Sequence, residues 1–231
     1  HFIISIKYSQ DKKMIKHIIF DLDETIGYFT QFIFIINIIH NYMPIDYNIQ
    51  FNNFISFFRP GIFDVFRELI YKKRNGQIQY VILYSNNNNI VFVNHVIDFI
   101  HHKIDYHLFD EIITLEDPRR TTRNKEYSDL VHCIPHIENG RLCFIDDRKH
   151  RLMLHENVDY IKCEKYTCEL KIDKIMDILK QYPLNHIHIY EELRTYRVSN
   201  KKLPIQVYSI SRNKMLEKIE IFIQNISLIN G

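Results

Sequence analysis

The hydrophobic positions of this chain form short apolar runs separated by stretches of helical periodicity, from about residue 14 to about residue 163. Apolar runs of about four to eight residues that end in polar or acidic residues are typical of buried parallel strands. The runs that predict such strands are 17–22, 78–84, 111–115, 142–145 and 158–162. Helical spacing lies between most of them, so the pattern predicts strand–helix–strand units and a Rossmann-like parallel sheet flanked by helices, an α/β fold.

Several segments between these runs have apolar residues at helical spacing. Arg59-Pro60-Gly61 marks the start of one helix, because proline is favoured in a first turn, and Gly76 marks its end. Segment 29–43 also predicts a helix, although its β-branched residues would suit a strand. The other predicted helices cover 89–104, 125–134 and 172–182, the last as the final helix of the core.

The pattern changes after about residue 165, and 172–182 is followed by a C-terminal segment of a different kind. Segment 185–197 predicts a further helix, whereas the alternation over 204–210 predicts a strand. Ser211 is a candidate N-cap of a closing helix with an apolar stripe. The stripe would pack on its own domain or form a partner or dimer contact, and it comprises Leu216, Ile219, Phe222, Ile223 and Ile226.

These patterns divide the chain into three parts. Residues 1–13 are an N-terminal extension or a cloning remnant, because the run that begins at Met14 would make a natural protein start. Residues 14–182 form the α/β domain. Residues 183–231 form a C-terminal α/β extension that packs on the core or binds a partner.

The composition has a strong bias that weakens helix and strand propensities as a guide. Isoleucine is the commonest residue, and the chain contains no alanine and no tryptophan. Codons for isoleucine, asparagine and lysine are AT-rich, so the bias is typical of an AT-rich genome, such as that of a parasite or a virus. Isoleucine therefore fills positions where other proteins use leucine or alanine.

Charge, cysteine content and hydropathy exclude several classes of protein. The formal net charge of +2 is too close to balance to indicate nucleic-acid binding by bulk electrostatics. Four cysteines in 231 residues do not form a disulfide scaffold, so a reducing intracellular compartment, cytoplasmic or nuclear, is expected. The longest apolar stretch, 32–39, is too short to span a bilayer, and no membrane partner is expected.

The sharpest chemical signal is the acidic pair Asp21 and Asp23, directly after the first predicted strand. Ligand sites in open parallel sheets lie beyond the carboxyl ends of the strands. Two carboxylates one residue apart on a tight turn can take different roles there. One can act as a nucleophile or metal ligand and the other as a general acid and base.

Three further features follow in order, each at a strand end or a helix start. Ser85 and Asn86 offer a hydroxyl and backbone N–H groups to a phosphate. The ammonium of Lys125 can neutralise a phosphoryl group and the nucleophile beside it. Asp146 and Asp147 supply further carboxylates for a hard cation.

This order of motifs resembles the haloacid dehalogenase superfamily of Mg²⁺-dependent phosphatases over about residues 15 to 165. The first motif of that family, DxDxT, matches Asp21, Asp23 and Thr25, and its hydroxyl motif matches Ser85. The basic motif is best matched by Lys125, and the acidic motif by 146–147. The resemblance implies a catalytic domain of this type over 14–182, with a small cap or none.

Within the superfamily, the acidic motif followed by 59–61 (RPG) looks like the carboxy-terminal-domain phosphatases, the group also called NLI-interacting-factor-like. These are similar to small phosphatases that act on phosphoserine in proteins. The segment 26–29 and the context of Ser85 depart from the usual sequences of that group. The resemblance therefore implies phosphoserine or phosphothreonine proteins as substrates less strongly than it implies the superfamily.

The resemblance also implies a role for each matched residue. Asp21 would attack phosphorus and form an aspartyl-phosphate, and Asp23 would act as general acid and then as general base. Mg²⁺ would be held by the Asp21 carboxylate, the Asp23 carbonyl and Asp146. Ser85 and Lys125 would hold the phosphoryl oxygens. Two residues would support them: Thr25 by fixing the turn, and Asp147 by binding Mg²⁺ through water or orienting Lys125.

Other interpretations remain open at the level of sequence. The basic run 119–123 would favour polyanionic or phosphopeptide substrates, or would simply be a solvated loop. A non-catalytic scaffold that reuses the fold is one alternative to the enzyme. A small-molecule or nucleotide phosphatase is another, in which 29–58 would form a lid over the substrate.

Overall fold

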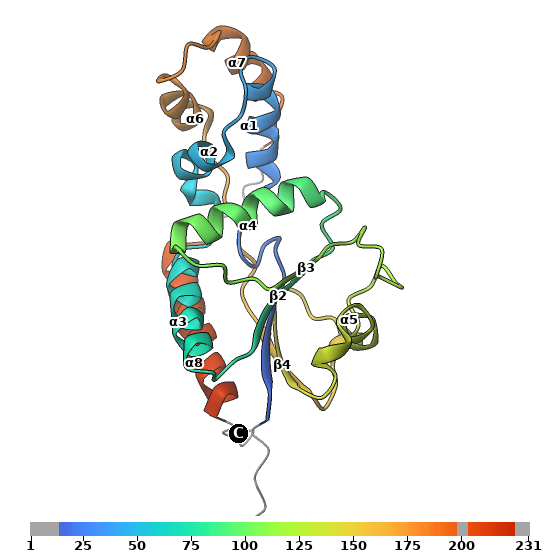
Figure 1. Cartoon of the computed structure of the whole chain (residues 1–231). Helices are drawn as coiled ribbons and strands as arrows, with labels where there is room; N and C mark the ends of the chain where they lie inside the picture. Colours follow the sequence, from blue (N-terminus) through green and yellow to red (C-terminus); the bar gives the residue numbers. More distant parts are fainter. Residues whose placement is uncertain (1–13, 198–202, 225–231) are drawn as a thin grey trace, which may run out of the picture.

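A computed structural model of the chain describes residues 14–197 and 203–224. Its centre is a five-stranded, all-parallel sheet with the spatial order β3-β2-β1-β4-β5 (Figure 1). The strands are β1 (Lys16–Phe20), β2 (Tyr80–Tyr84), β3 (Glu111–Ile113), β4 (Arg141–Asp146) and β5 (Val158–Lys162). All five lie within or overlap the predicted runs, and the predicted Rossmann-like α/β fold is confirmed.

Helices cover both faces of the sheet, and the strand residues alternate between two hydrophobic clusters. In β1, Ile18 and Phe20 join the larger cluster, whereas Ile19 joins the smaller one, because successive side chains of a strand point to opposite faces. Helices α3 and α8 lie on one side and α5 on the other (Figure 1). The helices and short 3-10 turns around the sheet are α3 (Ile62–Arg74), α4 (Ile90–Ile104), α5 (Tyr127–Cys133), α8 (Ile205–Gln224), η2 (Pro135–Ile137) and η3 (Arg151–Met153), whereas the short turn η1 (Ile55–Phe57) packs with the helix that precedes it.

Four more helices form a group beyond α4, away from the sheet (Figure 1). Its members are α1 (Thr30–His40), α2 (Tyr47–Asn53), α6 (Ile172–Leu179) and α7 (His186–Leu193). The rings of Phe32 and Phe51 stack with centroids 4.6 Å apart, which joins α1 to α2. The helical prediction for 29–43 is therefore confirmed. Helix α6 packs with α7 in this group, and its buried residues Ile175 and Leu179 belong to the same hydrophobic cluster as Ile18 and Phe20 of β1.

The C-terminal segment departs from the prediction. Helix α8 already begins at Ile205, so 204–210 is not a strand, and Ser211 lies inside the helix instead of at its N-cap. The buried positions recur every three or four residues, a period that the short alternation over 204–210 concealed. They are Tyr208, Ser211, Met215, Ile219, Phe222 and Ile223.

The apolar stripe of α8 packs on its own domain, against α3 and β5. Leu216 is half-buried at the margin of the larger cluster, and Ile226 lies outside the described residues. Within 183–197 and 203–224 the extension is helical, so the predicted α/β character is wrong for the described part. No helix in the described ranges is both long enough and apolar enough to cross a membrane.

The side chain of His17 is buried in β1, and its protonation is expected to make the stability of the fold depend on pH. Its ring stacks on Tyr80 with centroids 5.4 Å apart, and neither ring nitrogen has a hydrogen-bond partner among the described residues. Burial, reinforced by the nearby His136, lowers the pKa of His17 to about 4. Between about pH 6.5 and pH 4, the His17 imidazole therefore binds a proton more readily in the unfolded chain than in the folded chain.

We expect the free energy of unfolding of the wild type to fall faster than that of His17→Phe as the pH drops from about 6.5 to 4. The phenyl ring preserves the stacking on Tyr80 and removes the titrating group. The difference in slope should reach up to about 1.4 kcal/mol per pH unit. Urea denaturation across this pH range measures it, and parallel curves for the two proteins would contradict the assignment.

Candidate functional site

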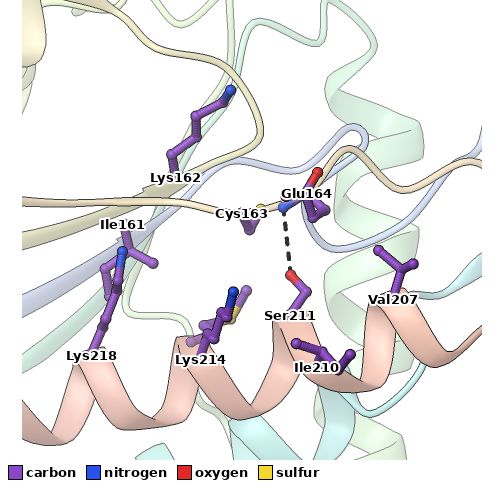
Figure 2. A pocket seen from close by; sticks show the side chains of 10 residues that line it. Ile161, Lys162, Cys163, Glu164, Val207, Ile210, Ser211, Lys214 and Lys218 are labelled. Carbon is purple, nitrogen blue, oxygen red and sulfur yellow. Dashed lines mark hydrogen bonds between the residues drawn. The ribbon is translucent and has the colours of Figure 1, made fainter. Parts of the chain in front are cut away.

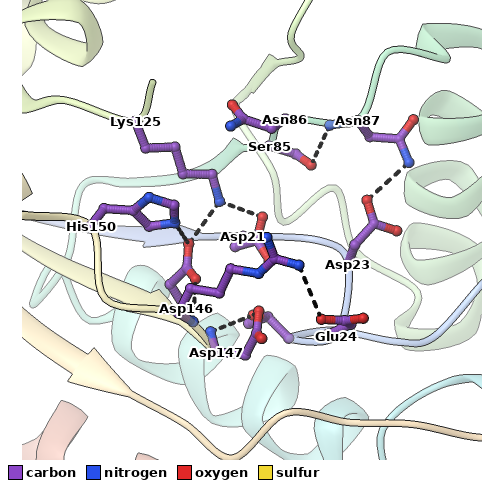
Figure 3. A network of polar contacts seen from close by, with 12 residues as sticks. Asp21, Asp23, Glu24, Ser85, Asn86, Asn87, Lys125, Asp146, Asp147 and His150 are labelled. Atoms are coloured by element: carbon purple, nitrogen blue, oxygen red, sulfur yellow. Dashed lines mark hydrogen bonds and ion pairs between the residues drawn. The ribbon is translucent and has the colours of Figure 1, made fainter. Parts of the chain in front are cut away.

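The carboxyl ends of three adjacent strands bring the predicted residues to one edge of the sheet. Asp21 follows β1, Ser85 follows β2, and Asp146 is the last residue of β4. The Asp21 N–H donates to the carbonyl oxygen of Ile145 at 3.0 Å, which continues the parallel ladder beyond the end of β1. Residues that lie up to 125 positions apart in the chain thus meet because parallel strands end at the same edge (Figure 3).

Lys125 lies between two of these carboxylates. Its ammonium donates to Asp21 Oδ1 and, at 2.7 Å, to Asp146 Oδ2, and only 3% of the residue is exposed. The loop before α5 delivers this lysine, not α5 itself, which begins at Tyr127. Lys125 was predicted to start this helix; it lies in the preceding loop instead, and its ammonium contacts the candidate nucleophile Asp21.

A second buried network fixes the loop that carries Lys125. The carboxylate of Asp129 accepts hydrogen bonds from the Tyr84 hydroxyl at 2.6 Å and from the Thr121 N–H and hydroxyl, and it lies 2.5 Å from Arg120 Nε. The Arg120 guanidinium also lies over the ring of Tyr84, 4.5 Å from its centroid. Buried charges are tolerated when they are paired in this way. The loop is thus held against β2 and α5.

The basic run 119–123 is consequently not a free cationic surface. Arg120 is buried by its pairing with Asp129, and Arg119 pairs with Glu111 and Asp117 at 3.0 and 2.9 Å. Arg123 is exposed and lies 3.9 Å from a carboxylate oxygen of Glu116. Carboxylates thus neutralise Arg119 and Arg120, whereas Arg123 remains exposed to solvent.

Three carboxylates converge beside Lys125. One oxygen from each of Asp21, Asp146 and Asp147 can be chosen so that all three lie within 4.8 Å of one another, and all three residues are buried. Burial, opposed by Lys125 and reinforced by Asp146, raises the pKa of Asp21 to about 7. Burial and the neighbouring Asp146 also raise the pKa of Asp147. These shifts report carboxylates that lack enough positive charge around them.

This donor set fits a divalent cation with oxygen ligands. Lys125 supplies one positive charge to a buried group of three carboxyl groups, and a hard cation would supply the charge that is missing. The Asp146 carboxyl already has a lowered pKa: although burial opposes it, the contacts of His150 and Lys125 favour the charged form. The chemistry of the donors therefore suits a metal such as Mg²⁺ without selecting it over similar ions.

Asp23 occupies the opposite side of the turn from this acidic cluster (Figure 3). Its carboxylate accepts a hydrogen bond from Asn87 Nδ2 at 3.0 Å, and burial raises its pKa against the effect of that hydrogen bond. Asp21 and Asp23 therefore have different surroundings, which suits different chemical roles.

Thr25 and Arg59 hold the turn that separates the two aspartates. The Asp147 N–H donates to Thr25 Oγ1 at 3.0 Å, so Thr25 links the turn to the end of β4. Glu24 has a φ of 65°, a conformation that costs a non-glycine residue about 1–3 kcal/mol. The buried Arg59 guanidinium donates to the carbonyl oxygens of Glu24, Thr25 and Glu164. Arg59 thus stabilises the turn in addition to preceding α3.

The two candidate phosphate-binding residues after β2 differ in what they offer. Ser85 is fully buried, and its Oγ accepts from the Asn87 N–H at 3.1 Å. The Asn86 side chain is already engaged, because Oδ1 accepts from Arg120 and Nδ2 donates to the Arg123 carbonyl oxygen. Asn86 can therefore contribute its backbone to an anion more readily than its side chain.

The predicted catalytic, phosphate-binding and metal-binding residues line one cavity of about 240 Å³. No residue of 29–58 lines it, so the lid on which the small-molecule alternative was based lies elsewhere, in the helical group of α1 and α2. The residues that line the cavity are Asp21, Asp23, Glu24, Ser85, Asn86, Lys125, Asp146, Asp147, Arg148 and His150.

Three contributors to the site were missed from the sequence. His150 Nε2 lies 3.3 Å from Asp146 Oδ2, and Arg148 pairs with Glu24 at 3.6 Å. The third is Asn87, which donates to Asp23. The run of basic residues directly after Asp147 was the available signal for the first two. No feature of the sequence singled out Asn87, because it is one of four consecutive asparagines, 86–89.

Comparison with protein-family models, with curated proteins and with solved structures found no match to this chain. The resemblance to the haloacid dehalogenase superfamily therefore stays an expectation based on motif order. The function of the chain must accordingly be inferred from the geometry and charge of the site itself.

We expect Arg59→Ala to lower the free energy of unfolding by about 3–5 kcal/mol, because three carbonyl oxygens, that of Thr25 fully buried, lose a charged donor and a large buried side chain is removed. Arg59→Lys should fall between this variant and the wild type, since an ammonium cannot reproduce the planar fork of a guanidinium. Urea denaturation measures both. Arg67→Ala, which removes an exposed arginine of the helix that follows Arg59, should change stability by less than about 1 kcal/mol; an equal loss in both alanine variants would refute this role.

Binding of a divalent cation is expected to raise the melting temperature. In millimolar Mg²⁺ or Mn²⁺ the wild type should gain stability, by about 2.7 kcal/mol if the cation is at a hundredfold excess over its dissociation constant. Asp146→Asn should lose this increment, whereas Asp173→Asn, an exposed aspartate of α6, should keep it. Thermal denaturation with and without metal measures the increment, and equal shifts in the two variants would exclude the acidic cluster as the site.

Proposed function

We propose that this chain is a Mg²⁺-dependent phosphatase that hydrolyses a phosphomonoester through an aspartyl-phosphate on Asp21. The observation that carries the proposal is the arrangement around the buried Asp21 carboxylate. It contacts Lys125, lies within the acidic cluster, and has Asp23 two residues away on the other side of the turn. This arrangement supplies a nucleophile, a charge-neutralising group and a separate acid in one cavity.

In the first half of the reaction, an Asp21 carboxylate oxygen forms a bond to phosphorus as the bond from phosphorus to the leaving oxygen breaks. Asp23 donates its proton to that leaving oxygen, so the alcohol departs neutral. The raised pKa of Asp23 favours the protonated form that this step needs. The hydrogen bond from Asn87 holds the Asp23 carboxyl on its side of the turn.

In the second half, water attacks phosphorus and the bond to Asp21 breaks, which releases inorganic phosphate. Asp23, now a carboxylate, accepts the proton of the attacking water. The two halves restore the protonation states of both aspartates. The same residue therefore serves as acid and then as base.

The phosphoryl oxygens need partners throughout. Lys125 and the Ser85 hydroxyl lie on the cavity wall and supply a charge and a donor, together with backbone N–H groups after β2. A cation bound by the Asp21 and Asp146 carboxylates and the Asp23 carbonyl, with Asp147 nearby, would neutralise the negative charge of nucleophile and substrate. His150 and the Arg148 N–H, which donates to Asp146 Oδ1 at 2.7 Å, orient Asp146 for this purpose.

Phosphoserine or phosphothreonine proteins are the substrates that this site suits best. The cavity is lined by polar residues and lacks cover from 29–58, so a phosphorylated side chain on a larger chain can reach it. An enclosed small molecule would instead need apolar walls and a lid. A non-catalytic scaffold would not need the buried charges, which cost stability when unpaired.

We expect hydrolysis of a generic aryl phosphate that requires Mg²⁺ and is lost in EDTA. Asp21→Asn should lower kcat/KM about a thousandfold or more, because the amide is not a nucleophile. Asp23→Asn should slow release of the phenol strongly, since the leaving group then departs without a proton. Steady-state rates measured by phenolate absorbance give both values.

The matched control is Asp173→Asn, the same change at an exposed position of α6, which should leave the rate unaltered. Activity that survives Asp21→Asn would overturn the covalent mechanism. Absence of hydrolysis of every phosphoester in a protein that binds Mg²⁺ would favour the scaffold.

A further inference from the structure

A second cavity lies between the edge strand β5 and helix α8 (Figure 2). Its volume is about 170 Å³, and it is lined by the end of β5, the two residues that follow, and one face of α8. The lining residues are Ile161, Lys162, Cys163, Glu164, Val207, Ile210, Ser211, Lys214, Met215 and Lys218. We refer to it as the β5–α8 groove.

The β5–α8 groove is positively charged. Lys162, Lys214 and Lys218 are exposed, and no ion pair or hydrogen bond engages their ammonium groups within residues 14–197 and 203–224. Glu164 is the single acidic residue of the lining set. Most other basic side chains near the catalytic cavity are paired, such as Lys165 with Glu24 at 2.6 Å. The groove therefore holds a local excess of uncompensated positive charge.

Two of these lysines, Lys214 and Lys218, are spaced to meet an extended ligand along α8. Lys214 and Lys218 lie one helical turn apart on the same face of α8, and their side chains extend toward β5 in Figure 2. Lys162 extends to the other side of β5, away from α8, because it alternates with Ile161 along the strand (Figure 2). The walls between them are apolar: Ile210 is 55% exposed although it lies beside buried neighbours. A chain with acidic side chains and one apolar side chain would meet complementary groups along this length.

The groove begins next to the catalytic cavity. Lys162 is the register partner of Asp146 on the adjacent strand, and adjacent strands lie about 4.8 Å apart. The loop that follows Lys162 links the groove to the catalytic turn. In the groove, the Glu164 N–H donates to Ser211 Oγ, and the Glu164 carbonyl oxygen accepts from Arg59, which stabilises the turn that carries Asp21 and Asp23. An extended peptide whose phosphorylated residue enters the cavity can reach the groove within a few residues.

We propose that the β5–α8 groove docks an acidic, extended segment of the phosphoprotein substrate, next to the residue that is dephosphorylated. This proposal rests on the proposed phosphatase function and specifies its substrate class. β5 is an edge strand, so one row of its backbone groups is directed outward and can bind an extended chain. A peptide fits better than a nucleic acid, because no aromatic side chain lines the groove for base stacking.

Binding of the peptide is tested first without catalysis. A fluorescein-labelled, unphosphorylated peptide that is rich in Asp and Glu and contains one Leu is titrated with the full chain by fluorescence anisotropy. Lys214→Glu/Lys218→Glu should weaken binding about tenfold or more, since two attractive contacts become repulsive. The matched control is Lys171→Glu/Lys174→Glu, the same charge change at exposed positions around the start of α6, which should bind as the wild type does.

Catalysis is tested separately with two substrates. With the phosphorylated form of the acidic peptide, Lys214→Glu/Lys218→Glu should raise KM about tenfold, whereas hydrolysis of an aryl phosphate should remain at the wild-type rate. Circular dichroism and the unchanged aryl phosphatase rate exclude misfolding as the cause. The difference between the two substrates is the expected signature of a docking surface outside the catalytic cavity.

The outcomes separate this proposal from the proposed function. Equal peptide affinity of the wild type and Lys214→Glu/Lys218→Glu would overturn the groove even if aryl phosphate is hydrolysed. Lysine-dependent peptide binding without any hydrolysis would support the groove and overturn the phosphatase, and with it the assignment of the peptide as a substrate segment. Displacement of the peptide by a short RNA that binds more tightly would overturn the choice of partner.

Discussion

The contact of Lys125 with Asp21 and Asp146 is the constraint on which the site depends. Each of these groups is almost completely buried, and a buried charge without a partner would cost several kcal/mol. The lysine reaches two carboxylates on neighbouring strands, so β1 and β4 must end in register and the loop before α5 must approach the same edge. One interaction therefore couples the sheet, the loop and the acidic cluster.

Two buried arginine side chains, those of Arg59 and Arg120, support this contact. Arg120 and Asp129 fix the loop that carries Lys125, and Arg59 fixes the turn that carries Asp21 and Asp23. Both arginines make several polar contacts with one planar group, which is what a guanidinium does better than an ammonium. The site is thus built on rigid supports on both sides, which suits chemistry that needs fixed distances.

The proposed reaction uses the difference between the two aspartates of the turn. Asp21 faces Lys125 and the acidic cluster, whereas Asp23 faces Asn87. The excess of negative charge in the cluster supports the proposed requirement for a cation, and the polar cavity without a lid supports the proposed protein substrate. In the proposed docking of an acidic substrate segment, the unpaired lysines of the β5–α8 groove would attract the part of the substrate that lies outside the cavity.

Much of the fold was predictable because it depends on local pattern. The five strands and helices such as α3 and α4 were located from apolar spacing and from the residues that end them. The main error lies in a segment whose short pattern fits both a strand and a helix. Residues 204–210 alternate as a strand would, but the buried positions Tyr208, Ser211 and Met215 follow helical spacing. Packing against α3 and β5 decided that segment, not its own sequence.

For the site, the residue types and their order could be recognised in the chain alone: acids after β1 and β4, a hydroxyl after β2, and a lysine between them. This was possible because the carboxyl ends of parallel strands meet at one edge regardless of the loops between them. Which charges are free depended instead on the folded arrangement. In the folded chain, Arg120 and the Asn86 side chain are paired and so are not free to bind a ligand, and Arg59 stabilises the turn. Lys214 and Lys218 have no such partner among the described residues. The sequence could not show this, because ion pairing depends on neighbours that are distant in the chain.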